Sequence, residues 1–151
     1  FNQGGFNKVE VIKIETEKRF IIGKHFKGNV SSKAFSELFI EIKDLKESNN
    51  LDGDLGNIYF NDPEKSEGEI KAFFGVISNQ QPVEVKGFEI FEITPNSYLQ
   101  GTINASSAFV NKTYNAIFEY AENNNIILDE EYIEWFPSEN EIVVQIKIKN
   151  E

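Results

Sequence analysis

One order of secondary structure occurs twice in this sequence, and this repeat limits the fold more than any other feature. Strand, strand, helix, strand, strand is the predicted order over residues 9–78, and the same order returns over residues 85–148. Ser32 in the first half matches Ser107 in the second, an offset of 107 − 32 = 75 residues. The sequence therefore predicts two copies of one small unit.

Three further matches support the duplication. Phe39 and Tyr114 each follow the matching serine by seven residues. Gly23 matches Gly101 in the second strand of each half, and the strand at 58–60 corresponds to the one at 133–136. We expect an α/β (α+β) fold in which duplicated β-β-α-β-β units form an antiparallel sandwich with two helices, related by a pseudo-twofold axis. The groove between the halves is the expected ligand site.

The two predicted helices follow serines that can cap them. Ser31 or Ser32 begins the first, and Ser106 or Ser107 begins the second. Residues at helical spacing then form one apolar face of each helix: Phe35, Leu38, Phe39, Ile42 and Leu45 in the first, and Val110, Tyr114, Ile117, Phe118 and Ala121 in the second.

Eight strands complete the two halves. Their predicted ranges are 9–15, 20–27, 57–61, 70–78, 85–93, 98–103, 132–136 and 142–148. In the last strand, Ile142, Val144 and Ile146 alternate with Val143 and Gln145, a pattern that predicts one buried face. Residues 1–8 are predicted to be a disordered leader, and residues 9–151 one domain.

Charge and composition exclude several functions. Asp and Glu number 25 against 15 Lys and Arg, a formal charge of −10, which repels phosphate backbones and argues against direct nucleic-acid binding. The chain has no cysteine and one histidine, so thiolate and multi-histidine metal sites are excluded, and we expect no metal or cofactor. No apolar run is long enough for a membrane span. We expect a cytoplasmic location.

The chain contains no methionine, even at position 1. It is therefore expected to be a fragment or a processed product. Two interpretations remain open: a stand-alone binding domain, or the ligand-binding module of a longer protein with an N-terminal domain or an anchor.

Several segments resemble GyrI-like domains, the effector-binding domains of AraC- and MerR-type regulators. Gly56-Asn-Ile-Tyr-Phe-Asn-Asp-Pro63 and the following Phe73-Phe-Gly-Val76 are similar to a Gly-x-Tyr-Tyr-Asp-x-Pro segment and a Tyr-x-x-Gly-Val strand of that family. Thr113-Tyr-Asn-Ala-Ile117 resembles its second helix, and Ile133-Glu-Trp-Phe136 its apolar-Glu-x-Tyr segment. The resemblance extends over residues 9–149 and rests on the order of these segments.

The resemblance implies a small-molecule-binding domain, of the kind that serves as a ligand sensor in transcription regulation. In the family, a buried glutamate faces the ligand between aromatic walls, and by position that glutamate is Glu134. The family's tyrosine two residues later is Phe136 here, so its hydroxyl is lost. Two further departures are that no helix-turn-helix precedes the domain and that the usual closing proline is absent.

The residues themselves also single out Glu134. By strand alternation it shares a face with Tyr132 and Phe136, which fits an aromatic pocket wall better than a solvated face. Trp135 points to the opposite side, and one interpretation is that it packs under a helix. The predicted ligand-binding residues are Glu134, Tyr59, Phe74, Tyr98, Tyr114 and Phe136. Taken singly, Phe74, Tyr98 and Tyr114 fit core packing better, and Tyr59 fits either role.

The leading interpretation is a non-enzymatic domain that binds an aromatic or lipophilic, cationic small molecule. Aromatic rings around a carboxylate suit such a cation, because each ring adds cation–π attraction of ~0.5–2 kcal/mol. Two alternatives remain. One is a hydrolase of small strained or aromatic compounds, with Glu134 as general acid or base and a nearby tyrosine as proton donor. The other is an acidic protein-interaction module similar to a gyrase inhibitor. Fold analogy does not choose among them.

Overall fold

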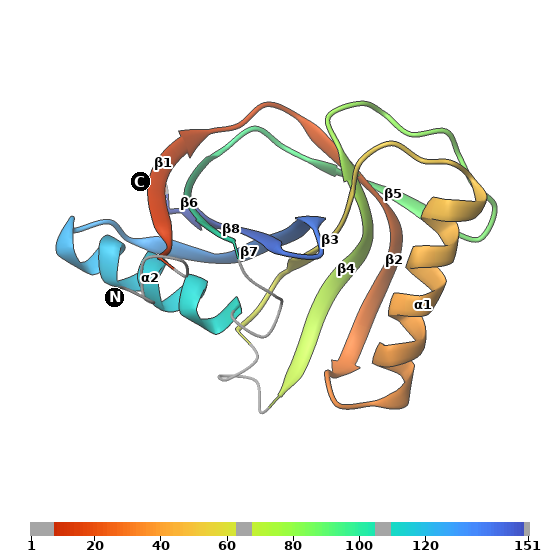
Figure 1. Ribbon diagram of the computed structural model, residues 1–151, viewed down its shortest axis with the longest axis horizontal. Coiled ribbons are helices and arrows are strands. Elements are labelled where there is room, and N and C mark those ends of the chain that lie inside the picture. The colour runs from red at the N-terminus through yellow and green to blue at the C-terminus, as the bar shows by residue number, and fades with distance from the viewer. Residues whose placement is uncertain (1–7, 63–67, 105–109, 150–151) are drawn as a thin grey trace. The chain divides into compact units, whose positions relative to one another are not determined.

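The computed structural model of the chain describes residues 8–62, 68–104 and 110–149 (Figure 1). The chain divides into two compact units. The continuous unit runs from Glu17 to Pro95, and the split unit combines residues up to Thr16 with those from Asn96 onward. Each unit holds one helix and one antiparallel sheet, so the fold is mixed α+β.

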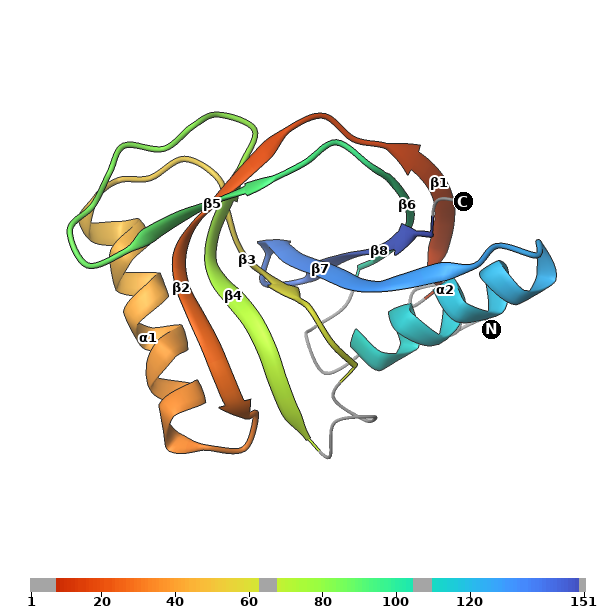
Figure 2. The same cartoon turned by 180° about the vertical axis from the view of Figure 1, so that it is seen from behind.

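The continuous unit contains four strands and helix α1, Lys33–Ser48. The strands are β2 (Arg19–Asn29), β3 (Asp54–Tyr59), β4 (Glu69–Ser78) and β5 (Glu89–Ile93). They pair antiparallel in the order β3-β4-β2-β5. Helix α1 packs on β4, β2 and β3, and Figures 1 and 2 show it beside β2 from both sides.

The split unit contains the other four strands and helix α2, Val110–Asn123. The strands are β1 (Glu10–Glu15), β6 (Ser97–Ile103), β7 (Leu128–Ser138) and β8 (Glu141–Ile148). They pair antiparallel in the order β7-β8-β6-β1, and α2 packs on β6, β8 and β1.

The two units have matching topologies, which confirms the predicted duplication of elements. The order β3-β4-β2-β5 corresponds strand for strand to β7-β8-β6-β1, with α1 and α2 at the same place in the chain order. The first strand of each repeat pairs with the second strand of the other repeat: β1 with β6, and β5 with β2. The compact unit is therefore not the sequence repeat. The pseudo-twofold axis and the groove between the halves stay predictions.

The chain leaves and re-enters the split unit at two hydrogen-bonded residues. Thr16 N–H donates to the Asn96 carbonyl at 2.9 Å, and Asn96 N–H donates to Thr16 Oγ1 at 3.2 Å. Ser97 Oγ also donates to the Glu15 carboxylate at 2.6 Å. These bonds hold β1 in register against β6, although the two strands lie about 80 residues apart in sequence.

Helix starts were predicted correctly where they can be checked. Ser32 is the N-cap of α1, and its hydroxyl accepts from Phe35 N–H at 3.2 Å. Ser106 and Ser107 lie outside the described residues, as does most of the predicted leader. Phe39 and Phe118, assigned to the buried helix faces, are each 45% exposed. Both lie at the edge of the apolar stripe, where the sheet covers only part of the ring.

Several strand predictions need correction. The strand expected over residues 57–61 is β3, which begins at Asp54, and the one expected over residues 132–136 is β7, which begins at Leu128. The strand expected over residues 85–93 is β5, which begins only at Glu89. Strand β8 is not half-exposed: Val143 (6% exposed) and Gln145 (2%) are buried along with Ile142, Val144 and Ile146. The cause is its central place between β6 and β7. The alternation in the sequence identified the more apolar face of β8, but it did not show that the opposite face is buried too.

The match of Gly23 with Gly101 is also wrong in structural terms. A Cβ on Gly101 would meet Thr113 and Ile117 of α2, so Gly101 is on the helix-covered face. Gly23 is on the face away from α1, because its neighbours Ile22 and Lys24 are on the helix side. The position on β2 that corresponds to Gly101 is therefore one residue away from Gly23.

Candidate ligand-binding site

Glu134 lies on the face of the split-unit sheet that α2 covers. Gly101, Val144 and Glu134 form one cross-strand row through β6, β8 and β7, and side chains in one row point to the same face. Since Gly101 faces α2, Glu134 does too. Its side chain is 8% exposed, which is rare for a carboxylate. Trp135, the residue considered for packing under a helix, is on the opposite face.

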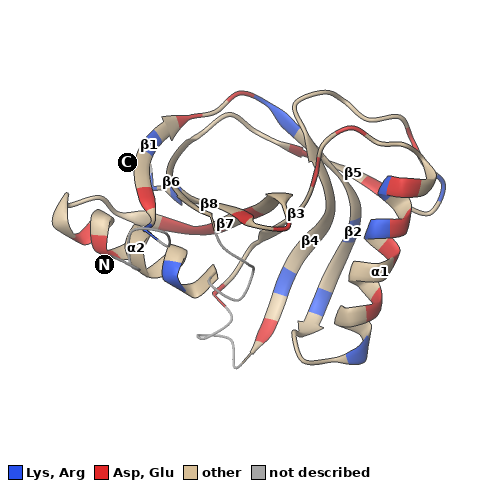
Figure 3. Cartoon of the chain, in the orientation of Figure 1, with Lys and Arg blue, Asp and Glu red and all other residues tan. Residues whose placement is uncertain are grey.

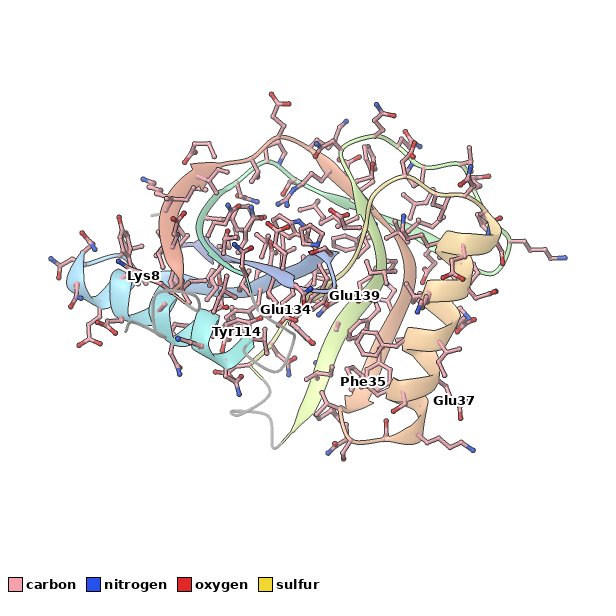
Figure 4. The ribbon with its side chains drawn as sticks, in the orientation of Figure 1. Lys8, Phe35, Glu37, Tyr114, Glu134 and Glu139 are labelled. Atoms are coloured by element: carbon pink, nitrogen blue, oxygen red, sulfur yellow. The ribbon has the colours of Figure 1, made fainter. Side chains whose placement is uncertain are left out.

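Tyr114 of α2 supplies a polar partner for this carboxylate. Its hydroxyl donates a short hydrogen bond to Glu134 Oε2 (Figure 4). Hydrogen bonds to charged oxygens are about twice as strong as neutral ones, and they offset part of the cost of removing a carboxylate from water. The phenol therefore holds the carboxylate in place within an otherwise apolar layer.

Two further aromatic rings contact the Tyr114 ring. Tyr132, two residues before Glu134, packs edge-on against Tyr114 with ring centroids 6.1 Å apart. Phe118, one helical turn after Tyr114, stacks on it at 6.3 Å and is half-exposed. The shared face of Tyr132 and Glu134 agrees with the predicted alternation, since they pair with Ile146 and Val144. Tyr132 was absent from the predicted ligand-binding set.

Phe136 and Tyr98 belong to the same unit but not to this cluster. Phe136 lies in an irregular stretch of β7 between Trp135 and Ser138, and it is half-buried. Tyr98 is fully buried, and it pairs with Lys147, three residues from Val144, so it is on the opposite face from Glu134. Its hydroxyl donates to Glu131 Oε2 at 3.3 Å.

Tyr59 and Phe74 belong to the continuous unit, where they contact each other. Their ring centroids are 5.9 Å apart, and Phe74 is 2% exposed. Both are on the face that α1 covers, together with Phe26 and Phe35. The predicted ligand-binding residues therefore divide between two units, and only Glu134 and Tyr114 are in hydrogen-bond contact.

Sequence reasoning missed Asn57. Phe74 is its direct partner across β3 and β4, and the row Lys24–Phe74–Asn57 is on the face that α1 covers. The row Gly101–Val144–Glu134 is likewise on the face that α2 covers. Asn57 is 2% exposed. The alternation of β3 could have predicted that Asn57 is buried. Leu55 and Tyr59, two residues before and after it, are apolar and lie on the same face of the strand.

The side chains in contact around Glu134 offer the chemistry of a carboxylate and of phenols. No group of three or more His, Asp or Glu side chains in residues 8–62, 68–104 and 110–149 could hold a metal ion. Acidic and basic residues are both present along α1 (Figure 3). No helix in the same ranges is long and apolar enough to cross a membrane.

Comparison with known families and curated proteins gives one match and one negative result. The family of GyrI-like small molecule binding domains matches residues 9–149, nearly the whole chain. No curated protein matches the sequence.

Solved structures share the fold at low identity. EcmrR, in a complex with DNA, superposes with a TM-score of 0.69 at 11% identity over 95% of this chain; the chain spans 58% of the EcmrR chain. SAV2435 bound to tetraphenylphosphonium gives 0.64 at 7% identity, covering 93% of this chain and 94% of the other. A hydrolase from Listeria innocua gives 0.58 at 9%, covering 93% and 92%.

Proposed function

Because the chain belongs to the family of GyrI-like small-molecule-binding domains, we propose that it is a ligand sensor or effector-binding module for aromatic, lipophilic cations. Glu134 supplies the negative charge, and Tyr114, Tyr132 and Phe118 supply the aromatic contacts. The ligand contacts predicted from the sequence for Tyr59, Phe74, Tyr98 and Phe136 stay predictions and are not part of this proposed site.

The observation that carries this proposal is the burial of Glu134 among aromatic rings. A carboxylate that is 8% exposed is costly unless a partner offsets its loss of water. The Tyr114 phenol that donates to this carboxylate is polar but carries no positive charge of its own. A bound cation would bring an opposite charge close to the carboxylate. The flanking rings attract the same cation through their negative faces, and the net charge of −10 favours its approach.

Tetraphenylphosphonium, the compound bound by SAV2435, has the required chemistry. It is a monovalent cation whose charge is enclosed by four phenyl rings, so it cannot donate a hydrogen bond. Its recognition would depend on ring contacts and on long-range attraction to Glu134. With an effective dielectric constant of about 20, two unit charges about 6 Å apart attract by roughly 2–3 kcal/mol.

Calorimetric titration with tetraphenylphosphonium and with the neutral triphenylphosphine oxide tests the proposal. Glu134→Gln keeps the size and an oxygen for Tyr114 but removes the charge. We expect it to weaken the cation about 30- to 100-fold and the neutral compound hardly at all. Glu130→Gln, the same change at an exposed position of β7, is the matched control. Equal losses for both compounds, or the same loss in the control, would reject the proposal.

The Tyr114–Glu134 hydrogen bond also favours a second function, a hydrolase of small strained or aromatic compounds. A carboxylate and a phenol in contact can share general acid–base work, since one accepts and the other donates a proton. Turnover of an aromatic ester that is abolished by Glu134→Gln and by Tyr114→Phe, but not by Glu130→Gln, would support it. Binding of the ester without turnover would reject the hydrolase and leave the ligand sensor as the proposed function.

A further inference from the structure

A second unusual polar group lies in the continuous unit, on the same face as α1. Asn57 of β3 is 2% exposed, and within the described part of the chain its side-chain Nδ2 donates no hydrogen bond. A buried amide donor without a partner is uncommon and destabilising. An apolar residue of similar size would avoid this cost, so the amide calls for an explanation other than packing.

Aromatic rings surround this amide. Phe74 is the direct cross-strand partner of Asn57, and Tyr59 is two residues farther along β3 on the same face. The Phe74 ring contacts Tyr59, Phe35 and Phe39 edge-on at centroid distances of 5.9, 5.2 and 5.4 Å. Rings in edge-to-face contact with one another can accept a further ring in the same geometry.

The ring cluster reaches the surface through helix α1. Phe39 is 45% exposed, although its ring contacts both Phe35 and the buried Phe74. Figure 4 shows Phe35 on α1, on the side that faces β2 and β4. An exposed ring changes rotamer within nanoseconds. Outward rotation of Phe39 would uncover the part of the Phe74 ring that Phe39 now contacts.

The polar surroundings favour a neutral molecule. Lys24, in the same cross-strand row as Asn57, is held in an ion pair with Glu41 of α1 at 2.7 Å, and its ammonium lies 5.2 Å from the Phe88 ring centroid. These charges compensate each other. Asn57 is itself uncharged, and its free group is a donor.

We propose that the α1-covered face of the continuous unit binds a neutral aromatic compound that carries a hydrogen-bond acceptor, such as an aryl ketone. The ring packs against Phe35, Phe39 and Phe74, and the acceptor oxygen receives the hydrogen bond that Asn57 Nδ2 offers. The site does not depend on Glu134, so the proposal goes beyond the cation sensor and can fail separately from it.

A matched pair of probes isolates the hydrogen bond. Acetophenone and ethylbenzene have nearly the same size and ring, but only the ketone accepts. We expect acetophenone to bind about tenfold more tightly, the ratio that one otherwise unmade buried hydrogen bond supports. In the ¹H–¹⁵N spectrum of the wild type, the side-chain NH₂ signals of Asn57 should shift with acetophenone and stay in place with ethylbenzene.

Asn57→Leu supplies the second measurement. It should remove the preference for acetophenone and raise Tm, because an unpaired donor is replaced by an apolar group of similar volume. A lower Tm with the preference retained would overturn the proposal. So would equal affinities in the wild type or unshifted Asn57 signals, and these two readouts hold even if the variant does not fold.

Competition with tetraphenylphosphonium separates this site from the one at Glu134. Acetophenone should bind equally well to the free protein and to protein saturated with the cation. If tetraphenylphosphonium and acetophenone displace each other one for one, the assignment of a separate site to the continuous unit is overturned.

Discussion

The hydroxyl of Tyr114 and the carboxylate of Glu134 join α2 to β7 across the intervening strand β8. No other residue of α2 makes a side-chain hydrogen bond to a strand among those found in the described residues. The rest of this interface is apolar, with Ile117 and Ala121 buried against the sheet. A single polar contact in an apolar layer fixes the position of the helix more sharply than the surrounding packing can.

Tyr114→Phe should destabilise the protein by roughly 1–3 kcal/mol, because it leaves the buried Glu134 carboxylate without its phenol partner. The double variant Tyr114→Phe/Glu134→Gln should cost less than the sum of the single variants, since neither group then loses a charged partner. Urea unfolding of the four proteins gives the coupling energy. Strict additivity would show that the hydrogen bond makes no net contribution to stability.

Phe74 and Phe118 are expected to differ strongly in their contribution to stability, although both are aromatic neighbours of the candidate sites. Phe74 is 2% exposed and Phe118 is 45% exposed. Phe74→Ala should cost roughly 3–5 kcal/mol through the cavity it leaves, whereas Phe118→Ala should cost about 1 kcal/mol or less. The same unfolding curves measure both. Similar losses would contradict the burial assigned to the two rings.

The order of elements could be predicted from the sequence because hydrophobic periodicity and capping are local signals. The Ser32 cap and the spacing of Leu38, Ile42 and Leu45 define α1 without reference to the rest of the chain. The exchange of β1 and β5 between the repeats could not be predicted in this way. Strand partners are set by contacts between distant segments, and nothing local to β1 indicates β6 as its neighbour.

The candidate site could be predicted only in part, because its assembly also depends on contacts between distant segments. Alternation placed Glu134 and Tyr132 on one face, and the family resemblance added Tyr114, but neither could show that α2 covers that face. Tyr98 was predicted as a ligand contact because it is aromatic, but the face on which it lies depends on its register with β8. Asn57 was overlooked because a single polar residue in a short strand is typical of a solvated face.

The pH dependence of stability should change in Asp54→Asn. Burial raises the pKa of Asp54 above 3.8, and the nearby Lys46 ammonium lowers it by a smaller amount. The folded protein then binds this proton more tightly than the unfolded chain, so the stability that Asp54 contributes is present below pH 3.8 and is lost as the pH rises through the folded pKa. The difference in Tm, variant minus wild type, should therefore become more positive between about pH 4 and pH 7.

A control for this measurement is Asp52→Asn, which removes a charge from an exposed position two residues before β3 begins. Subtracting its effect removes the general benefit of lowering the net charge of an acidic protein. If Asp54→Asn shows the same difference in Tm at every pH, the burial of Asp54 does not influence its proton affinity.

The close approach of α2 to β6 requires a glycine at position 101. A Cβ there would lie 2.9 Å from Thr113 Cγ2 and 3.0 Å from Ile117 Cδ1. Thr113 is β-branched and has little rotamer freedom in a helix, and both side chains are completely buried. Gly101→Ala should therefore cost roughly 1–3 kcal/mol by overpacking. Since Tyr114 adjoins Thr113, the Gly101→Ala substitution should also weaken the hydrogen bond between Tyr114 and Glu134 and lower the affinity for tetraphenylphosphonium.

Thr113→Ser distinguishes this steric cause from a loss of backbone freedom. The serine lacks the Cγ2 that the new methyl group would meet, so Gly101→Ala should cost less in the Thr113→Ser background than in the wild type. Gly87→Ala is the contrasting case: nothing lies within 4 Å of its Cβ position, but its φ of +91° strains an alanine. Its cost should be the same in both backgrounds. If Thr113→Ser relieves neither substitution, the contact between helix and strand does not limit residue 101; if it relieves both equally, its effect on stability is general and not steric.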